Sequence, residues 1–206
     1  WAILYDEAGL SQLVRLANTI STAGLVPAHL RGQIPDIVLA LGIARAMNEN
    51  PILVLQSIYV INGRACWSAQ YLIARANRSG RFRGPINWRE EGEGDSLSVT
   101  AYAIVAETGD RVESTVSMAM AKADGWATKN KKYQTMPLVM LRYRSATLLV
   151  RQFCPDVLMG LHEQSEIIDV YGEIPRTVEY TDPEPALSPP RVRAPQPADG
   201  GRGPVT

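Results

Sequence analysis

Residues 135–153, TMPLVMLRYRSATLLVRQF, set the arrangement that the rest of the chain has to satisfy. The stretch predicts a helix, with Thr135 as its N-cap and Pro137 tolerated in its first turn. Its apolar side chains cover a very wide arc of the helix, so we expect the helix to be buried. Nevertheless it contains three arginines and no acid.

The three arginines take different positions around this helix. Arg144 and Arg151 are seven residues apart and lie within about 20° of each other, with Thr147 nearby. Two aligned guanidinium groups on a buried helix require an anion. Arg142 lies about 160° from Arg144, inside the apolar arc. Arg142 must therefore extend to the surface, pair with a carboxylate, or face a groove.

Charge is unevenly distributed along a chain whose formal net charge is zero. Residues 61–151 hold 14 Lys or Arg and 8 Asp or Glu, whereas residues 152–206 hold 4 and 9. Between residues 119 and 151 there are seven basic residues and one acid. A basic middle followed by an acidic end predicts a polyanion-binding surface beside a solvated tail.

Several candidate residues could form this surface. The segment WATKNKKYQT, residues 126–135, combines three lysines with Trp126 and Tyr133. Phosphate binding favours such cations, and aromatic rings can stack on bases. The candidates for DNA binding are Arg144, Arg151, Arg142, Lys129, Lys131, Lys132, Lys122, Arg64, Trp67, Arg75, Arg78 and Arg81.

Structural roles compete with this interpretation for most of these residues. A basic loop is usually a solvated surface, and Arg75 and Arg78 near a helix C-terminus can offset the helix dipole. Trp67 and Trp126 are more often packed in a core than exposed for stacking. Arg142 suits a structural ion pair as well as a DNA contact.

The rest of the chain predicts helices around strands. Helical spacing appears in residues 9–24, 35–50, with Asp36 as the cap, and 68–80, with Ser68 near the N-terminus, and Pro51 opens a short helical turn. Asn-Gly within YVINGRACW, residues 59–67, favours a type I′ hairpin.

Three antiparallel strands are expected between the helical regions. They lie in GPINWREE (84–91), SLSVTAYAIVA (96–106) and VESTVSMAMA (112–121), with a turn at ETGDR (107–111). The predicted fold is therefore α+β, with helices packed around a small antiparallel sheet that carries a basic DNA groove. Residues 1–172 form the domain, and residues 173–206, with 8 of the 14 prolines, form a disordered, flexible tail.

Catalytic and metal-binding patterns are missing from the sequence. There is no phosphate-binding GxxxxGK[ST] loop and no GxGxxG or GxSxG motif, and two histidines are poor material for a metal site. The acidic segment EEGEGD, residues 90–95, suits a solvated turn better than a metal-dependent hydrolase built on Glu91 and Asp95. We therefore expect no enzyme, no cofactor and no metal. Cys66 and Cys154 form no CxxC pair and fit a reducing compartment. No membrane span or signal peptide is expected.

Three segments together resemble the RecT/Bet family of phage single-strand annealing proteins, and the RecT branch most closely. They are NENPILVLQSIYVINGRACWSAQYLIARANRSGRF (48–82), SMAMAKADGW (117–126) and QTMPLVMLRYRSATLLVRQFCPDVLMGL (134–161). They occur in the family's order and cover most of residues 35–165. The most specific segment is the Met-Leu-Arg-Tyr-Arg motif with a further arginine seven residues after its second, here Arg142, Arg144 and Arg151.

The resemblance implies a protein that binds single-stranded DNA and anneals complementary strands without nucleotide hydrolysis. Members of the family form rings or helical filaments and work beside a phage exonuclease. They act in the cytoplasm of a bacterial host and are encoded by a phage or prophage. The counterparts of Arg144 and Arg151 contact the DNA backbone, and the loop corresponding to Lys129–Lys132 lines the groove. Arg64 is a weaker correspondence.

The chain departs from the family's lambda beta branch before the arginine motif. That branch has basic residues where this chain has Leu138 and Val139. The acidic end of the chain corresponds to a region used for partners, which makes the exonuclease and a host single-strand-binding protein candidates. The alternatives are a passive single-strand-binding module, the metal-dependent hydrolase, and a structural oligomer whose arginines pair with acids such as Asp156 or Glu163 across subunits.

Overall fold

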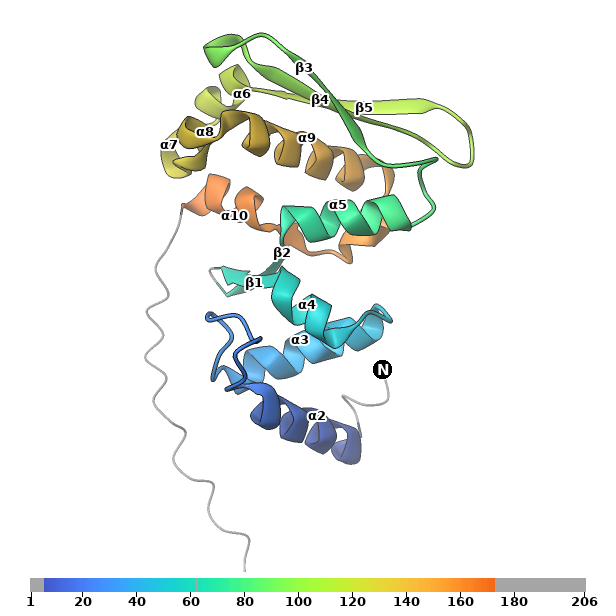
Figure 1. Ribbon diagram of the computed structural model, residues 1–206, viewed down its shortest axis with the longest axis vertical. Coiled ribbons are helices and arrows are strands. Elements are labelled where there is room, and N and C mark those ends of the chain that lie inside the picture. Colours follow the sequence, from blue (N-terminus) through green and yellow to red (C-terminus); the bar gives the residue numbers. More distant parts are fainter. Residues whose placement is uncertain (1–5, 62, 173–206) are drawn as a thin grey trace, which may run out of the picture. The chain divides into compact units, whose positions relative to one another are not determined.

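The structure is a computed structural model that describes residues 6–61 and 63–172 (Figure 1). The predicted α+β class is confirmed. The α-helices are α2 (Glu7–Ile20), α3 (Ile34–Ala46), α4 (Pro51–Ser57), α5 (Ala69–Arg78), α6 (Met118–Ala123), α7 (Trp126–Lys129), α8 (Lys132–Thr135), α9 (Pro137–Phe153) and α10 (Gln164–Tyr171). The strands are β1 (Ile58–Ile61), β2 (Arg64–Trp67), β3 (Asn87–Glu91), β4 (Ser98–Ile104), β5 (Arg111–Ser117) and β6 (His162–Glu163). Two short 3-10 helices, η1 (Gly94–Ser96) and η2 (Pro155–Leu158), are also present.

The expected three-stranded sheet is present, with the antiparallel order β3–β4–β5. Trp88 lies opposite Ala101, and Thr100 lies opposite Thr115. The connection from β4 to β5 turns at Gly109, whose φ of +79° is a conformation that glycine adopts at little cost. Strand β4 is therefore the central strand; a turn links it to β5, and β3 pairs with its other side.

Helix α9 lies between this sheet and a layer that contains α5 and α10 (Figure 1). On the sheet side, Met140 and Leu141 join a cluster with Val99 and Val116. On the opposite side, Leu149 and the other buried residues at the C-terminal half of α9 join the larger core. Burial on two sides explains why α9 is apolar around most of its circumference.

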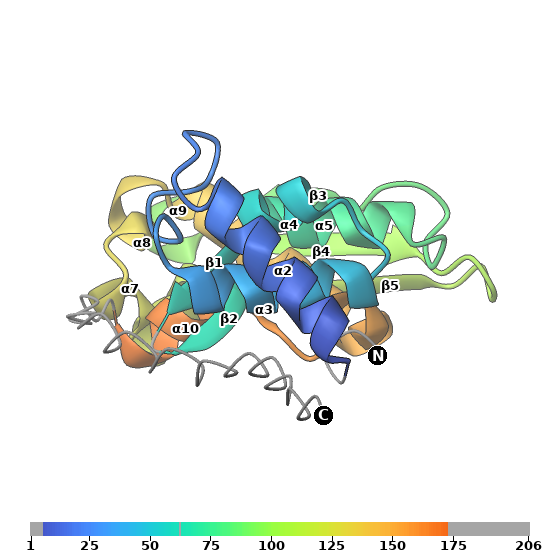
Figure 2. The same cartoon turned by 90° about the horizontal axis from the view of Figure 1, so that it is seen from below.

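The larger core extends from α9 to the N-terminal helices. Helix α2 packs against α3, and α3 packs against α4 (Figure 2). The predicted hairpin is present as β1 and β2, with Gly63 at a φ of +72°. Ser68 caps α5 as expected, accepting a hydrogen bond from the Tyr71 amide at 3.3 Å.

A second small sheet was not predicted. Strand β6 pairs with β2 in parallel, so that Cys66 lies opposite His162 and Trp67 lies opposite Glu163. Two residues of strand give too weak a pattern to be recognised in a sequence. This pairing places the start of α10 beside the hairpin, although about a hundred residues separate them along the chain.

Three local predictions were wrong. Asp36 lies in the first turn of α3 and does not cap it, because Gln33 holds the N-cap position. Thr135 ends α8, and Met136 takes the N-cap position of α9 with no side-chain hydrogen bond. The third strand ends at Ser117, whose hydroxyl caps α6. The alternation of Met and Ala in 118–121 resembles a strand, but both are strong helix formers.

Both cysteines lie in the interior of the protein. Cys66 and Cys154 are free and buried, and burial raises the pKa of each thiol to about 11, which keeps both protonated. No helix within residues 6–61 and 63–172 combines the length and apolar character needed to cross a membrane. The predicted tail, residues 173–206, lies outside the described residues.

Candidate functional site

The arginine helix presents its three guanidinium groups to two different neighbours. Arg142 points toward β3, where its Nε donates a hydrogen bond to Glu90 Oε1 at 2.7 Å. Its side chain remains 44% exposed. Of the three alternatives for Arg142, the structure contains the carboxylate pair. Arg144 and Arg151 point the other way, toward α10.

Arg144 is buried in an ion cluster. Only 7% of the residue is exposed. Its Nη1 atom lies 3.4 Å from Glu166 Oε1 and 3.8 Å from Asp169 Oδ2. The guanidinium carbon also lies 4.4 Å from the centroid of the Trp126 ring, a cation–π distance. The anion that this helix requires is therefore present within the chain, on α10.

Arg151 shares the same carboxylate. Its Nη2 atom pairs with Glu166 Oε2 and lies 3.4 Å from His162 Nδ1. The Arg151 side chain is 38% exposed, whereas that of Glu166 is 7% exposed. Glu166 thus bridges the two arginines that the helical spacing aligned.

Asp169 connects this cluster to the basic loop. It accepts hydrogen bonds from the Tyr133 hydroxyl at 2.9 Å and from Asn130 Nδ2 at 3.2 Å. Burial raises the pKa of Asp169, and the Arg144 charge and these two hydrogen bonds act in the opposite direction. Burial likewise raises the pKa of Tyr133, which keeps its phenol protonated as a donor. The loop before α9 is therefore anchored to α10.

Several donors of the stripe are left without a partner. The buried atoms Arg144 Nε, Arg144 Nη1, Thr147 Oγ1 and Arg151 Nε have no hydrogen-bond partner within the part of the chain that the structure describes. Buried polar atoms are hydrogen-bonded in the great majority of native proteins, so four in one stripe are unusual. The stripe offers more donors than the acids of α10 use.

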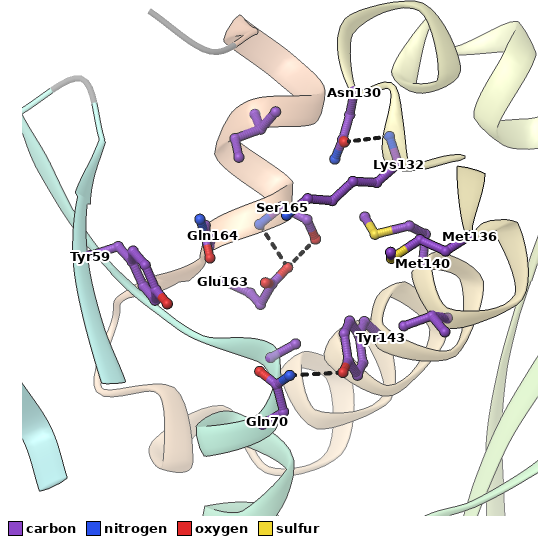
Figure 3. Close-up of a pocket in the computed structure, with 13 residues that line it drawn as sticks. Tyr59, Gln70, Asn130, Lys132, Met136, Met140, Tyr143, Glu163, Gln164 and Ser165 are labelled. Atoms are coloured by element: carbon purple, nitrogen blue, oxygen red, sulfur yellow. Dashed lines mark hydrogen bonds between the residues drawn. The ribbon is translucent and has the colours of Figure 1, made fainter. Parts of the chain in front are cut away.

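A cavity of about 300 Å³ is lined by residues of α9, α10 and the hairpin (Figure 3). Its lining comes from the hairpin, α5, the loop and start of α9, and α10, and includes Lys132, Tyr143 and Glu163. Glu163 is the N-cap of α10, and its Oε2 accepts hydrogen bonds from the amide and hydroxyl of Ser165. Burial raises the pKa of Glu163 from its usual 4.5 to about 7.

The basic loop contributes two neighbouring cations that make no ion pair with a carboxylate of the described residues. Lys131 and Lys132 are exposed, and no carboxylate among the described residues lies within ion-pair distance of either. Lys129 donates a hydrogen bond to the Val170 carbonyl of α10 at 2.8 Å. Lys122 pairs with Asp95. Within this loop, the positive charge available to a ligand is thus that of Lys131 and Lys132.

The arginines of α5 and of the segment that follows are paired at some distance from the loop. Arg75 and Arg78 both contact Glu49, at 3.4 and 3.0 Å. Arg81 contacts Asp156 at 3.2 Å. These ion pairs link α5 to the N-terminal helices and to η2. The structure does not bring them together with the α9 stripe into one surface.

The hairpin candidates have separate positions. Trp67 is fully buried, and its Nε1 donates a hydrogen bond to the Leu158 carbonyl at 3.2 Å, so it occupies the core position and offers no stacking face. Trp126 is also buried, under Arg144. The Arg64 guanidinium lies 5.7 Å from the Tyr171 ring centroid, near the end of α10.

The structure also shows the contacts of the residues on which the hydrolase and structural-oligomer hypotheses depend. Glu91 pairs with Arg89, and Asp95 pairs with Lys122. No three His, Cys, Asp or Glu side chains gather as metal ligands among residues 6–61 and 63–172. Asp156 and Glu163 are not the acids that the three arginines contact; those acids are Glu90, Glu166 and Asp169 of the same chain.

Sequence reasoning missed the acidic side of this cluster. Glu163, Glu166 and Asp169 are spaced by three residues, which aligns them roughly along one face of a helix. That spacing, shortly after an arginine helix without acids, was a usable signal. These three acids were counted only as part of the negative charge of residues 152–206.

Comparison of the chain with models of known families, with curated proteins and with solved structures finds no match.

Proposed function

We propose that the chain binds single-stranded DNA through its sugar-phosphate backbone and anneals complementary strands without hydrolysing a nucleotide. The observation that carries the proposal is the basic run 119–151, in which exposed Lys131 and Lys132 precede a helix whose Arg144 and Arg151 are aligned. The likeness of residues 134–161 to the RecT/Bet motif supports the same assignment.

The mechanism is electrostatic and geometric. Lysine and arginine neutralise phosphates and release condensed counterions, which makes binding depend on salt and not on base sequence. Backbone contacts leave base edges free, so a second strand supplies the specificity by pairing. Family likeness extends the proposal to a homo-oligomeric ring or filament on DNA, and to a phage exonuclease and a host single-strand-binding protein as partners.

Lysine variants test the binding part of this proposal. Lys131→Ala and Lys132→Ala should each weaken binding to a labelled oligo-thymidylate and lower the slope of log affinity against log salt by roughly 0.7 per lost phosphate contact. Arg15→Ala, on exposed α2, removes the same charge away from the site and is the control. Fluorescence anisotropy across a salt series measures both quantities. Equal affinities and slopes in the three variants would exclude the loop as the binding site.

A structural role for the arginine helix is the second candidate, and burial of Arg144 specifically favours it. Under this alternative, Arg144 and Arg151 hold α10 in place and never meet DNA. Single-stranded DNA affinity would then be insensitive to acids on α10.

A further inference from the structure

A single carboxylate occupies the position between the two arginines that the proposed function assigns to phosphate. Glu166 contacts both Arg144 and Arg151, and Asp169 lies near the same Arg144 nitrogen, Nη1, as Glu166. DNA phosphates cannot reach the Arg144 guanidinium while α10 remains in place, because Arg144 is 7% exposed. The proposed DNA contacts and the observed fold therefore require α10 to move.

The contacts that Arg144 makes with the acids of α10 are longer than ordinary charge-assisted hydrogen bonds. Charge-assisted N–H···O bonds are usually about 2.7–2.9 Å long. Arg144 Nη1 lies 3.4 Å from Glu166 and 3.8 Å from Asp169. The buried atoms Arg144 Nε, Thr147 Oγ1 and Arg151 Nε, in addition, have no hydrogen-bond partner among the described residues. A phosphodiester has two unesterified oxygens, and successive phosphates along a strand supply more acceptors than one shared carboxylate.

The segment before α10 contains two left-handed residues and a very short strand. Met159 and Gly160 are consecutive residues with positive φ, +52° and +76°, between η2 and β6. Such a conformation is uncommon for a residue with a side chain. β6 is only two residues long, and the cavity of about 300 Å³ separates part of α10 from α9 and the hairpin. Lys132 lines that cavity, so an incoming backbone meets a cation beside the gap between the two helices (Figure 3).

We propose that α10 is a displaceable anionic latch, in which Glu166 and Asp169 take the place of DNA phosphates beside Arg144 and Arg151. A single strand replaces them and also reaches the Thr147 hydroxyl. This inference rests on the proposed function and adds its regulation. The latch keeps the guanidinium groups neutralised in the free chain. The apparent affinity for DNA is then the intrinsic affinity multiplied by the fraction of molecules in which α10 is displaced.

Replacing Glu166 tests the latch. Glu166→Gln keeps the size of the side chain and an acceptor oxygen but removes the charge that competes with phosphate. It should bind the labelled oligo-thymidylate at least roughly 5-fold more tightly than the unmodified chain, the lower end of ordinary coupling between two sites. Glu113→Gln is the matched control, because it removes one charge from an exposed pair with Arg111 on β5. The control should leave the affinity within twofold.

The outcomes separate the latch from the proposed function. If the unmodified chain binds and Glu166→Gln gives no gain over the control, the latch is wrong and DNA binding stands. If neither the chain nor Glu166→Gln binds, both proposals fail. Where the substitution unfolds the protein, amide hydrogen exchange of the unmodified chain decides. With added oligonucleotide, exchange within residues 164–171 should rise under the latch, whereas slower exchange there would overturn it.

Discussion

The two sides of α9 treat similar arginines in opposite ways. Toward the sheet, Arg142 makes one pair with Glu90 at the edge of an apolar contact, and its side chain is 44% exposed. Toward α10, Arg144 is buried between two acids and an aromatic ring. The difference teaches that spacing within a helix identifies which charges are aligned but not whether their partner is solvent, ligand or another helix.

The largest difference that we predict between the two sides of α9 is in how much an arginine contributes to the free energy of unfolding. Arg144→Ala leaves Asp169 buried without a cation and leaves Glu166 with Arg151 alone. This loss should lower the free energy of unfolding by about 3–5 kcal/mol. Arg142→Ala removes a partly exposed pair and should cost less than about 1 kcal/mol. Urea denaturation of both variants measures the two values. Similar losses for the two variants would show that the sides of α9 are not different in kind.

Much of the fold on both sides of α9 could be predicted, for physical reasons that are local. Asn-Gly demanded a tight hairpin at 62–63, and Ser68 was an effective cap followed by helical spacing. The contact between α9 and α10 could not be predicted in this way. It joins residues 144 and 166 by an ion pair, and the two-residue pairing of β6 with β2 precedes α10 in the chain. Neither propensity nor periodicity reports on such contacts.

The candidate site was predicted on its basic half only. The stripe of Arg144 and Arg151 was identified from the helical period, and the requirement for an anion followed from burial. The identity of that anion depended on tertiary structure. Trp67 illustrates the same limit, because an aromatic residue in a hairpin reads equally as a stacking face or as core until its neighbours are known.

A second prediction concerns pH on the α10 side. The pKa of Glu163 is raised from 4.5 to about 7 by burial, so the folded chain binds its proton more tightly than the unfolded chain does. Stability from this group is therefore present at low pH and is lost as pH rises from 4.5 to about 7. Relative to the unmodified chain, Glu163→Gln should gain about 3 kcal/mol over this interval.

Urea denaturation at several pH values between 4 and 8 measures this difference. Asp169, whose pKa is also raised, titrates in both proteins and does not contribute to the comparison. Parallel pH profiles for the two proteins would contradict the assignment to Glu163.

The smallest predicted effect on stability comes from Thr147. Its buried hydroxyl has no hydrogen-bond partner among the described residues, so Thr147→Val removes an unmet polar group while keeping the shape. We expect the free energy of unfolding to be unchanged or to rise by up to about 1 kcal/mol. Single-stranded DNA affinity should fall, because the latch assigns this hydroxyl to phosphate. A clear loss of stability in thermal unfolding would indicate a partner for Thr147 in the free chain.

The most direct test of the central claim is the rate at which two complementary labelled oligonucleotides anneal, measured by fluorescence with and without the full chain and without ATP. The proposed function predicts that the protein accelerates annealing at low salt and that the acceleration fades as salt is raised, because phosphate contacts are lost. DNA binding without acceleration would leave a passive single-strand-binding module. If the chain neither binds single-stranded DNA nor accelerates annealing at low salt, that result would contradict the assignment of α9 and its basic loop to DNA.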